Sequence, residues 1–235
     1  MRPTFKIACS RFQEEELSIK QKVIAIDGPS ASGKGTVALR VAQALGFDYL
    51  DSGALYRLTA LYAEKRGVGW HNEEAVAQLA ENLPVRFEET RIMLNDEDVS
   101  VQIRSETIGM GASAIAQLPK VRAALLQRQR DFLTEKGLVA DGRDMGSVVF
   151  PDAVLKVFLT ASAQVRAQRR ARQLGLPCEG VEFDRILSDI EARDEADRRR
   201  PIAPLRQLPD AVLLDTTDLG IEESVKKVLD WYRKL

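Results

Sequence analysis

Cysteine and histidine are scarce in this chain of 235 residues. Its two cysteines are Cys9 and Cys178, and its single histidine is His71. Two distant cysteines cannot build a disulfide framework, and the two residue types together are too few for a zinc site. The composition therefore excludes small disulfide-bonded and zinc-stabilised domains, and it favours a reducing, cytoplasmic location.

Long apolar runs are also missing. No segment approaches the roughly 18 consecutive apolar residues that a membrane-spanning helix needs. The first 22 residues, MRPTFKIACSRFQEEELSIKQK, contain neither the continuous apolar core of about 7–15 residues nor the small-residue cleavage site of a signal peptide. We expect residues 1–22 to form a polar N-terminal extension of a soluble protein that has no membrane partner.

A strong charge of either sign is absent as well. The formal net charge is −1 at pH 7, from 34 basic and 35 acidic residues. Such a balance creates no overall basic field for nucleic acid or anionic lipid, so nucleic acid is not an expected partner. Any anionic ligand must be bound by a local arrangement of positive groups.

The segment VIAIDGPSASGKGTVALRVAQALGF, residues 23–47, has the pattern of a strand, a loop and a helix. Val23–Ile26 is an unbroken apolar run, as in a strand buried on both faces. Val37, Val41 and Leu45 then recur every four residues before Gly46, which predicts a helix and its end.

The loop of this segment contains Gly-x4-Gly-Lys. Glycines between a strand and a helix let backbone N–H groups turn towards phosphates, and the helix dipole and the lysine add positive charge. The usual motif has Ser or Thr directly after the lysine, whereas Gly35 intervenes here, so we assign no metal ligation to Thr36. We predict an ATP-binding phosphate loop made of Gly28, Pro29, Ser30, Ala31, Ser32, Gly33, Lys34, Gly35 and Thr36.

Further apolar runs predict a parallel sheet wrapped by helices. These runs are Tyr49–Leu50, Leu138–Ala140, Val154–Leu159 and Val212–Leu214. Helical patterns separate most of them, and an amphipathic helix is predicted from Ile221 to Tyr232. Each run ends in polar residues, so ligands should bind at the carboxyl ends of the strands.

Two excursions interrupt this pattern. Residues 83–103 alternate apolar and polar side chains around two turns, which predicts a small β excursion, and a helix should begin near Pro119. Residues 166–200 are highly charged and contain Gly175, Pro177 and Gly180, which predicts two helices broken by a loop.

Three short motifs, GKGT, LDSGALYR and ADGRDMG, together resemble the bacterial cytidylate kinases, which are nucleoside monophosphate (NMP) kinases. The resemblance runs from about Val23 to near the C-terminus. It implies an α/β fold with a P-loop NTPase-type parallel sheet in a single kinase domain over residues 23–235. It also implies an NMP-binding region with its insert at about 53–130 and a mobile helical lid at about 166–192.

The resemblance implies a phosphotransferase that moves a phosphoryl group from ATP to CMP, and also to dCMP, with Mg²⁺. We expect it to act as a monomer. The acceptor phosphate is already largely dianionic at pH 7, so the reaction needs positive charge rather than a general base. We predict Lys34, Arg143, Arg166 and Arg170 as catalytic cations. Asp141 is predicted to organise Mg²⁺ through water, with strand or helix capping as the alternative.

Arg166, Arg169 and Arg170 have the spacing of one helical face in the lid, although a solvated surface helix would also explain them. Arg193, Asp197 and Arg200 also fall on one face if the helix is continuous, with surface ion pairing as the alternative. The predicted CMP-binding residues are Ser52, Arg57, Ser113, Arg122, Arg143, Asp144, Arg193, Asp197 and Arg200. Ser113, Arg122 and Asp144 would contact the cytosine base, although Asp144 could instead cap a helix.

Other functions remain to be distinguished. A GTPase is excluded because the sequence has no Asn-Lys-x-Asp motif. Another small-molecule or NMP kinase, for example one that acts on UMP, and a non-catalytic nucleotide-binding protein are the alternatives. Measuring ADP release with each NMP would separate them.

Overall fold

The computed structural model describes residues 22–88 and 91–235. The predicted N-terminal extension therefore lies outside the described residues, apart from Lys22. The chain divides into two compact units. The first comprises the described residues up to Leu50 together with Phe132–Arg199 and Ala203–Leu235, and the second comprises Asp51–Asp131 and Arg200–Ile202. Within the described ranges, no helix is long and apolar enough to cross a membrane.

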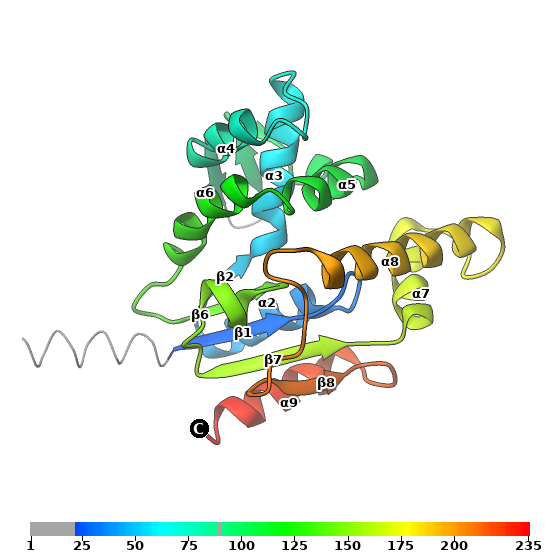
Figure 1. Ribbon diagram of the computed structural model, residues 1–235. Coiled ribbons are helices and arrows are strands. Elements are labelled where there is room, and N and C mark those ends of the chain that lie inside the picture. Colours follow the sequence, from blue (N-terminus) through cyan, green and yellow to red (C-terminus); the bar gives the residue numbers. More distant parts are fainter. Residues whose placement is uncertain (1–21, 89–90) are drawn as a thin grey trace, which may run out of the picture. The chain divides into compact units, whose positions relative to one another are not determined.

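The first unit is built on a five-stranded sheet in the order β2-β6-β1-β7-β8. Figure 1 shows β1 between β6 and β7. The strands are β1 (Val23–Asp27), β2 (Asp48–Asp51), β6 (Leu138–Gly142), β7 (Leu155–Thr160) and β8 (Val212–Asp215). β1 pairs in parallel with β6 and with β7, and β7 pairs in parallel with β8. The predicted α/β fold with a parallel sheet is confirmed, and the carboxyl ends of its central strands meet at one edge.

Two helices pack on this sheet through a shared apolar core. They are α2 (Lys34–Leu45) and α9 (Ile221–Tyr232), and the two helices that were predicted here are confirmed. Val41 of α2 and Val228 of α9 are fully buried in the same cluster as Ile24 and Ile26 of β1. The core therefore fixes the start of α2 relative to the end of β1, which is where the phosphate loop lies.

The charged segment after β7 forms two helices, α7 (Ala163–Leu174) and α8 (Val181–Arg199), as predicted. Gly175 ends α7 in the left-handed conformation, with φ 69°. The two helices share a small core that includes Ala167, Ala171, Phe183 and Ile190.

The predicted helical face of Arg193, Asp197 and Arg200 is wrong for Arg200, because α8 ends at Arg199. Pro201 follows directly, and a residue before proline is disfavoured in the helical conformation. The helix therefore stops one residue before the third member of the predicted face.

The second unit contains the predicted β excursion. Its antiparallel sheet has the order β3-β4-β5, with β3 at Val85–Phe87, β4 at Ile92–Leu94 and β5 at Glu97–Asp98. The surrounding helices are α3 (Ser52–Lys65), α4 (Glu73–Glu81), η1 (Gln102–Arg104), α5 (Glu106–Ile115) and α6 (Pro119–Arg130). Pro119 occupies the first turn of α6, as predicted. Leu55, Leu58 and Leu61 of α3 are fully buried, which makes α3 the central helix of this unit.

Candidate active site

The phosphate loop has the strand-loop-helix geometry that its sequence predicts. A Cβ on Gly28 would lie 2.0 Å from the carbonyl oxygen of Leu159, so only glycine fits directly after β1. Gly33 has φ 91°, in the left-handed region that favours glycine, and α2 begins at the next residue. Lys34 Nζ donates to the carbonyl oxygen of Pro29 at 3.3 Å. The loop therefore presents a helix N-terminus and a lysine together, and both favour the binding of an anion.

Asp141 lies in β6 beside the first turn of α2. Its side chain is buried, and Oδ1 accepts a hydrogen bond of 2.7 Å from the hydroxyl group of Tyr49. A Cβ on Gly35 would lie 3.7 and 3.9 Å from the two carboxylate oxygens of Asp141. The carboxylate thus faces the position that Ser or Thr occupies in the usual motif, whereas Thr36 is exposed.

Arg143 connects the end of β6 to the phosphate loop and to α8. Its Nη2 donates to Ser30 Oγ at 2.8 Å, and its Nε donates to Asp197 Oδ2 at 2.6 Å. Burial lowers the pKa of Arg143, but the negative charge and hydrogen bond of Asp197, then the charges of Asp141 and Asp194, raise it overall. Arg143 is therefore a fixed positive charge beside the loop.

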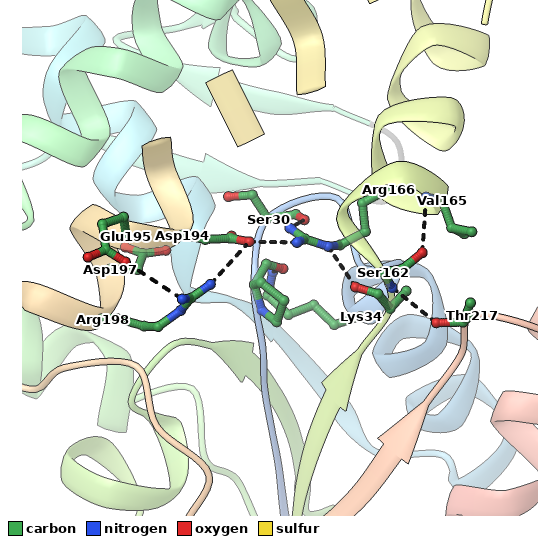
Figure 2. A network of polar contacts seen from close by, with 12 residues as sticks. Ser30, Lys34, Ser162, Val165, Arg166, Asp194, Glu195, Asp197, Arg198 and Thr217 are labelled. Carbon is green, nitrogen blue, oxygen red and sulfur yellow. Dashed lines mark hydrogen bonds and ion pairs between the residues drawn. The ribbon is translucent and has the colours of Figure 1, made fainter. Parts of the chain in front are cut away.

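Arg166 of α7 is buried between the phosphate loop and α8 (Figure 2). Its Nη1 donates to the Ser30 carbonyl oxygen at 3.1 Å, and its Nη2 donates to Asp194 Oδ2 at 2.6 Å. Its Nε donates to the carbonyl oxygen of Ala161 at 2.9 Å. This burial rules out a solvated surface position for Arg166.

Arg169 makes a second connection between α7 and the phosphate loop. Its Nη1 donates to the carbonyl oxygen of Ser32 at 2.9 Å, and its Nη2 donates to that of Thr216 at 2.6 Å. Arg170 follows on the same helix and is half-buried. Arg166, Arg169 and Arg170 therefore share one helix, and the first two donate to carbonyl groups of the loop.

Asp144 is buried at the N-cap position of η2, a single turn of π-helix at Met145–Val149. Within the described ranges, its side chain makes no capping hydrogen bond to this turn. Asp27 supplies the cap instead, because it accepts from the backbone N–H groups of Met145 and Gly146. The alternative role of Asp144 as a helix cap is therefore not supported.

The remaining predicted residues of the first unit lie on α8. Arg193 is half-buried in the middle of this helix, one turn before Asp197. The first unit thus brings together the phosphate loop, Asp141, the Arg143–Asp197 ion pair and helix α7, which carries Arg166, Arg169 and Arg170.

The second unit holds five of the predicted CMP-binding residues. Ser52 Oγ donates to Gln129 Oε1 at 2.7 Å, and Arg57 Nη1 donates to the carbonyl oxygen of Ile103 at 2.9 Å. Ser113 Oγ donates to the carbonyl oxygen of Gly109 at 3.1 Å, and Arg122 Nη1 donates to that of Ala116 at 3.3 Å. Arg200 is buried in the short segment of this unit that follows α8.

Four residues of this site were missed by the sequence analysis: Tyr49, Thr216, Asp27 and Asp194. Each forms a hydrogen bond with a residue far away in the chain. Asp194 follows Arg193 directly in the run ARDEADRRR, where several acids have equivalent spacing. The only available signal was that Asp194 and Asp197, three residues apart, share a helical face.

Comparison with known proteins places this geometry in a family. The family model for cytidylate kinase matches residues 24–234. A cytidylate kinase from Neisseria meningitidis serogroup A is 75% identical over 216 residues, which are 92% of this chain and 99% of that protein. A cytidylate kinase from Chromobacterium violaceum is 59% identical over 212 residues, which are 90% of this chain and 96% of that protein. An uncharacterised protein from Eubacterium ventriosum of known structure aligns with a TM-score of 0.51 at 11% identity over 92% of this chain and 100% of its own, a likeness of fold alone. The chain belongs to the cytidylate kinase family.

Proposed function

We propose that this chain transfers a phosphoryl group from ATP to CMP and forms CDP and ADP. One observation carries the proposal: in a chain of the cytidylate kinase family, a phosphate loop after β1 lies beside the β6 end that holds Asp141, Arg143 and Asp144. ATP and CMP are its substrates, and we propose dCMP as a further acceptor. The alternatives of a different NMP kinase and of a non-catalytic binder are not favoured.

Positive charge around the transferred phosphoryl group supplies the catalysis. The acceptor phosphate of CMP has its second pKa near 6 and is mostly dianionic at neutral pH, so no general base is needed. We propose that residues 28–36 bind the ATP phosphates and that Lys34, Arg143, Arg166 and Arg170 neutralise the transferred group. The bonds from Arg143 and Arg166 to Ser30 support this role, because they hold both guanidinium groups at the loop.

The carboxylate of Asp141 fits a magnesium ion held largely through water. Across residues 22–88 and 91–235, no group of three or more His, Cys, Asp or Glu side chains could form a protein cage for a metal. Mg²⁺ suits such a site, since it keeps several waters and takes phosphate oxygens as ligands. When bound, the ion would neutralise charge on the ATP phosphates. Asp141 would orient its water shell, and Tyr49 would fix the Asp141 carboxylate.

In the first unit we propose Arg143, Asp144, Arg193 and Asp197 as CMP contacts. Arg143 would bind the acceptor phosphate, and a side-chain oxygen of Asp144 would accept from the exocyclic amino group of cytosine. Asp197 would accept from a ribose hydroxyl group. A carboxylate has several lone pairs, so its bond to Arg143 is compatible with this second one.

In the second unit we propose Ser52, Arg57, Ser113, Arg122 and Arg200 as CMP contacts. Arg57 would bind the acceptor phosphate, and Arg122 would donate to the N3 and O2 acceptors of cytosine. Ser113 can donate or accept, so it would discriminate least between bases.

We also propose the organisation that the family resemblance implies. The unit at Asp51–Asp131 would be the NMP-binding region, and the lid at about 166–192 would comprise most of α7 and the first part of α8. The enzyme would act as a monomer in the cytoplasm.

ADP release measured with ATP, Mg²⁺ and one of CMP, dCMP, UMP, AMP or GMP tests the function. CMP should give the highest kcat/KM. Lys34→Ala should lower kcat at least about 100-fold without changing the melting temperature, because it removes the charge of a half-buried side chain that is not part of the apolar core. Lys226→Ala is the matched control, since Lys226 forms a surface ion pair on α9. A preference for another NMP, or near-normal turnover in folded Lys34→Ala, would contradict the proposal.

A further inference from the structure

Asp27 is a buried carboxyl group at the end of β1, one residue before the phosphate loop. A negative charge at this place is unfavourable for binding phosphate groups, so it calls for another explanation. Oδ1 accepts from the backbone N–H of Met145 at 2.8 Å, and Oδ2 accepts from that of Gly146 at 2.9 Å. Each carboxylate oxygen is thus bonded to a different residue of the turn that follows β6.

These two bonds fix the start of η2. The first N–H groups of a helical turn have no acceptor within the turn itself. The residue at the N-cap position, Asp144, does not supply one through its side chain in the described structure. Asp27 supplies both acceptors from a neighbouring strand, across more than a hundred residues of chain.

The turn fits closely against Asp27. A Cβ on Gly146 would lie 3.5 Å from Asp27 Oδ2 and 3.1 Å from Cδ of Lys156. There is little room for the turn to shift between the carboxylate and β7. The direction in which the chain leaves β6 is therefore set by Asp27.

The two residues directly before this turn are Arg143 and Asp144. Arg143 connects to Ser30 of the phosphate loop and to Asp197 of α8. A small rotation of the backbone at residues 145–146 would redirect both side chains, because Asp144 lies one residue and Arg143 two residues before Met145.

We propose that Asp27 is a positioning residue for base recognition: by holding the Met145 and Gly146 N–H groups, its carboxylate aims Asp144 at the cytosine amino group and Arg143 at the acceptor phosphate. This inference rests on the proposed function of Arg143 and Asp144. Asp27 acts through the backbone of the turn.

The charges around Asp27 are consistent with this role. Burial raises its pKa, the two backbone hydrogen bonds lower it, and the charges of Asp144 and Arg143 act in opposite directions; together these effects raise the pKa to about 6. The carboxyl group is therefore mostly ionised at pH 7. An ionised carboxylate only accepts hydrogen bonds, which matches the two N–H donors that face it.

The test compares kcat/KM for CMP and for UMP in the wild type, in Asp27→Asn and in Asp152→Asn, an exposed control. Asparagine has the same shape but turns an NH2 donor towards one of the two N–H groups. We expect the CMP/UMP ratio to fall about 10-fold through a higher KM for CMP, with KM for ATP changed less than about twofold. Asp152→Asn should leave every value unchanged. The ionisation of the acceptor phosphate is common to both substrates and cancels in the ratio.

An unchanged CMP/UMP ratio in folded Asp27→Asn would overturn the inference, and so would equal increases in KM for CMP and ATP. If Asp27→Asn does not fold, the ratio is measured in Asp27→Ser, whose hydroxyl can still accept one bond, and the same two outcomes decide. Failure of the proposed function looks different, because the wild type itself would then show no preference for CMP.

Discussion

The buried ion pair between Arg166 and Asp194 gives a prediction whose size follows from the structure. The two side chains are 5% and 2% exposed, and Nη2 lies 2.6 Å from Oδ2. Asp194→Ala would leave a buried guanidinium group without its counter-ion, and such a loss costs about 3–5 kcal/mol. Arg166 would keep its hydrogen bonds to the carbonyl groups of Ala161 and Ser30, so we expect the lower end of this range, a loss of about 3 kcal/mol in the free energy of unfolding. For a chain of this size, that lowers Tm by about 6–12 °C.

Removing both charges should have a different effect from removing one. Asp194 Oδ1 is buried with no hydrogen-bond partner among the described residues, so the native pair is itself incompletely satisfied. Replacing a buried pair with apolar residues of similar volume is often neutral or stabilising. The free energy of unfolding of the double variant, Arg166→Met with Asp194→Leu, should therefore lie within about 1 kcal/mol of the wild-type value.

Urea unfolding and kcat, measured on the same preparations, separate stability from catalysis. The double variant should regain stability while kcat stays about 100-fold low, because the proposed catalytic charge of Arg166 is gone. Two results would refute this reasoning. One is a loss below about 1 kcal/mol in Asp194→Ala, and the other is a double variant that regains both stability and normal turnover.

Three further predictions concern the region before α2. The pKa of Asp27 is raised from 3.8 to about 6 in the folded state, so stability from this group is fully present below pH 3.8 and is lost as pH rises through 6. At 1.36 kcal/mol per pH unit, the free energy of unfolding of Asp27→Asn relative to the wild type should rise by about 2.5 kcal/mol between pH 4 and pH 7, measured by urea unfolding. A difference that stays constant with pH would contradict this. Gly28→Ala should lower the free energy of unfolding by at least about 2 kcal/mol, because its Cβ would overlap the carbonyl oxygen of Leu159. Gly220→Ala is the control: its Cβ would meet no described atom within 4 Å, so the free energy of unfolding should stay unchanged in the same assay. Deleting residues 1–20 should leave kcat and Tm nearly unchanged, since this segment precedes the first core strand; a large loss of either would mean that it packs on the folded protein.

The sequence predicted the phosphate loop, the parallel sheet and both excursions, because each rests on a local pattern. The apolar run of β1, the glycines of the loop and the four-residue spacing in α2 are contiguous in the chain. Local propensity and apolar periodicity can be read from neighbouring residues, and here they agree with the global fold.

The partners of the site residues could not be predicted in the same way. Arg166 and Asp194 are 28 residues apart, and Asp27 and Met145 are 118 apart. The charge pattern of α8 offers several equivalent acids, and only the packing of α7 against α8 selects Asp194. The error at Arg200 has a local cause, because Pro201 ends the helix that the periodicity would extend.

The proposed role of Asp144 in selecting CMP over UMP gives the most direct test of the proposed site. Cytosine presents an amino donor where uracil presents a carbonyl oxygen, which an ionised carboxylate repels. The wild type should prefer CMP by about 2–4 kcal/mol in kcat/KM, or about 30-fold to 1,000-fold. The measurement is kcat/KM for both nucleotides in the wild type and in Asp144→Ala, with folding checked by thermal melting. We predict that Asp144→Ala loses most of the preference, chiefly through weaker use of CMP. An unchanged CMP/UMP ratio, with both rates lowered together, would show that Asp144 is structural and that the base is recognised elsewhere.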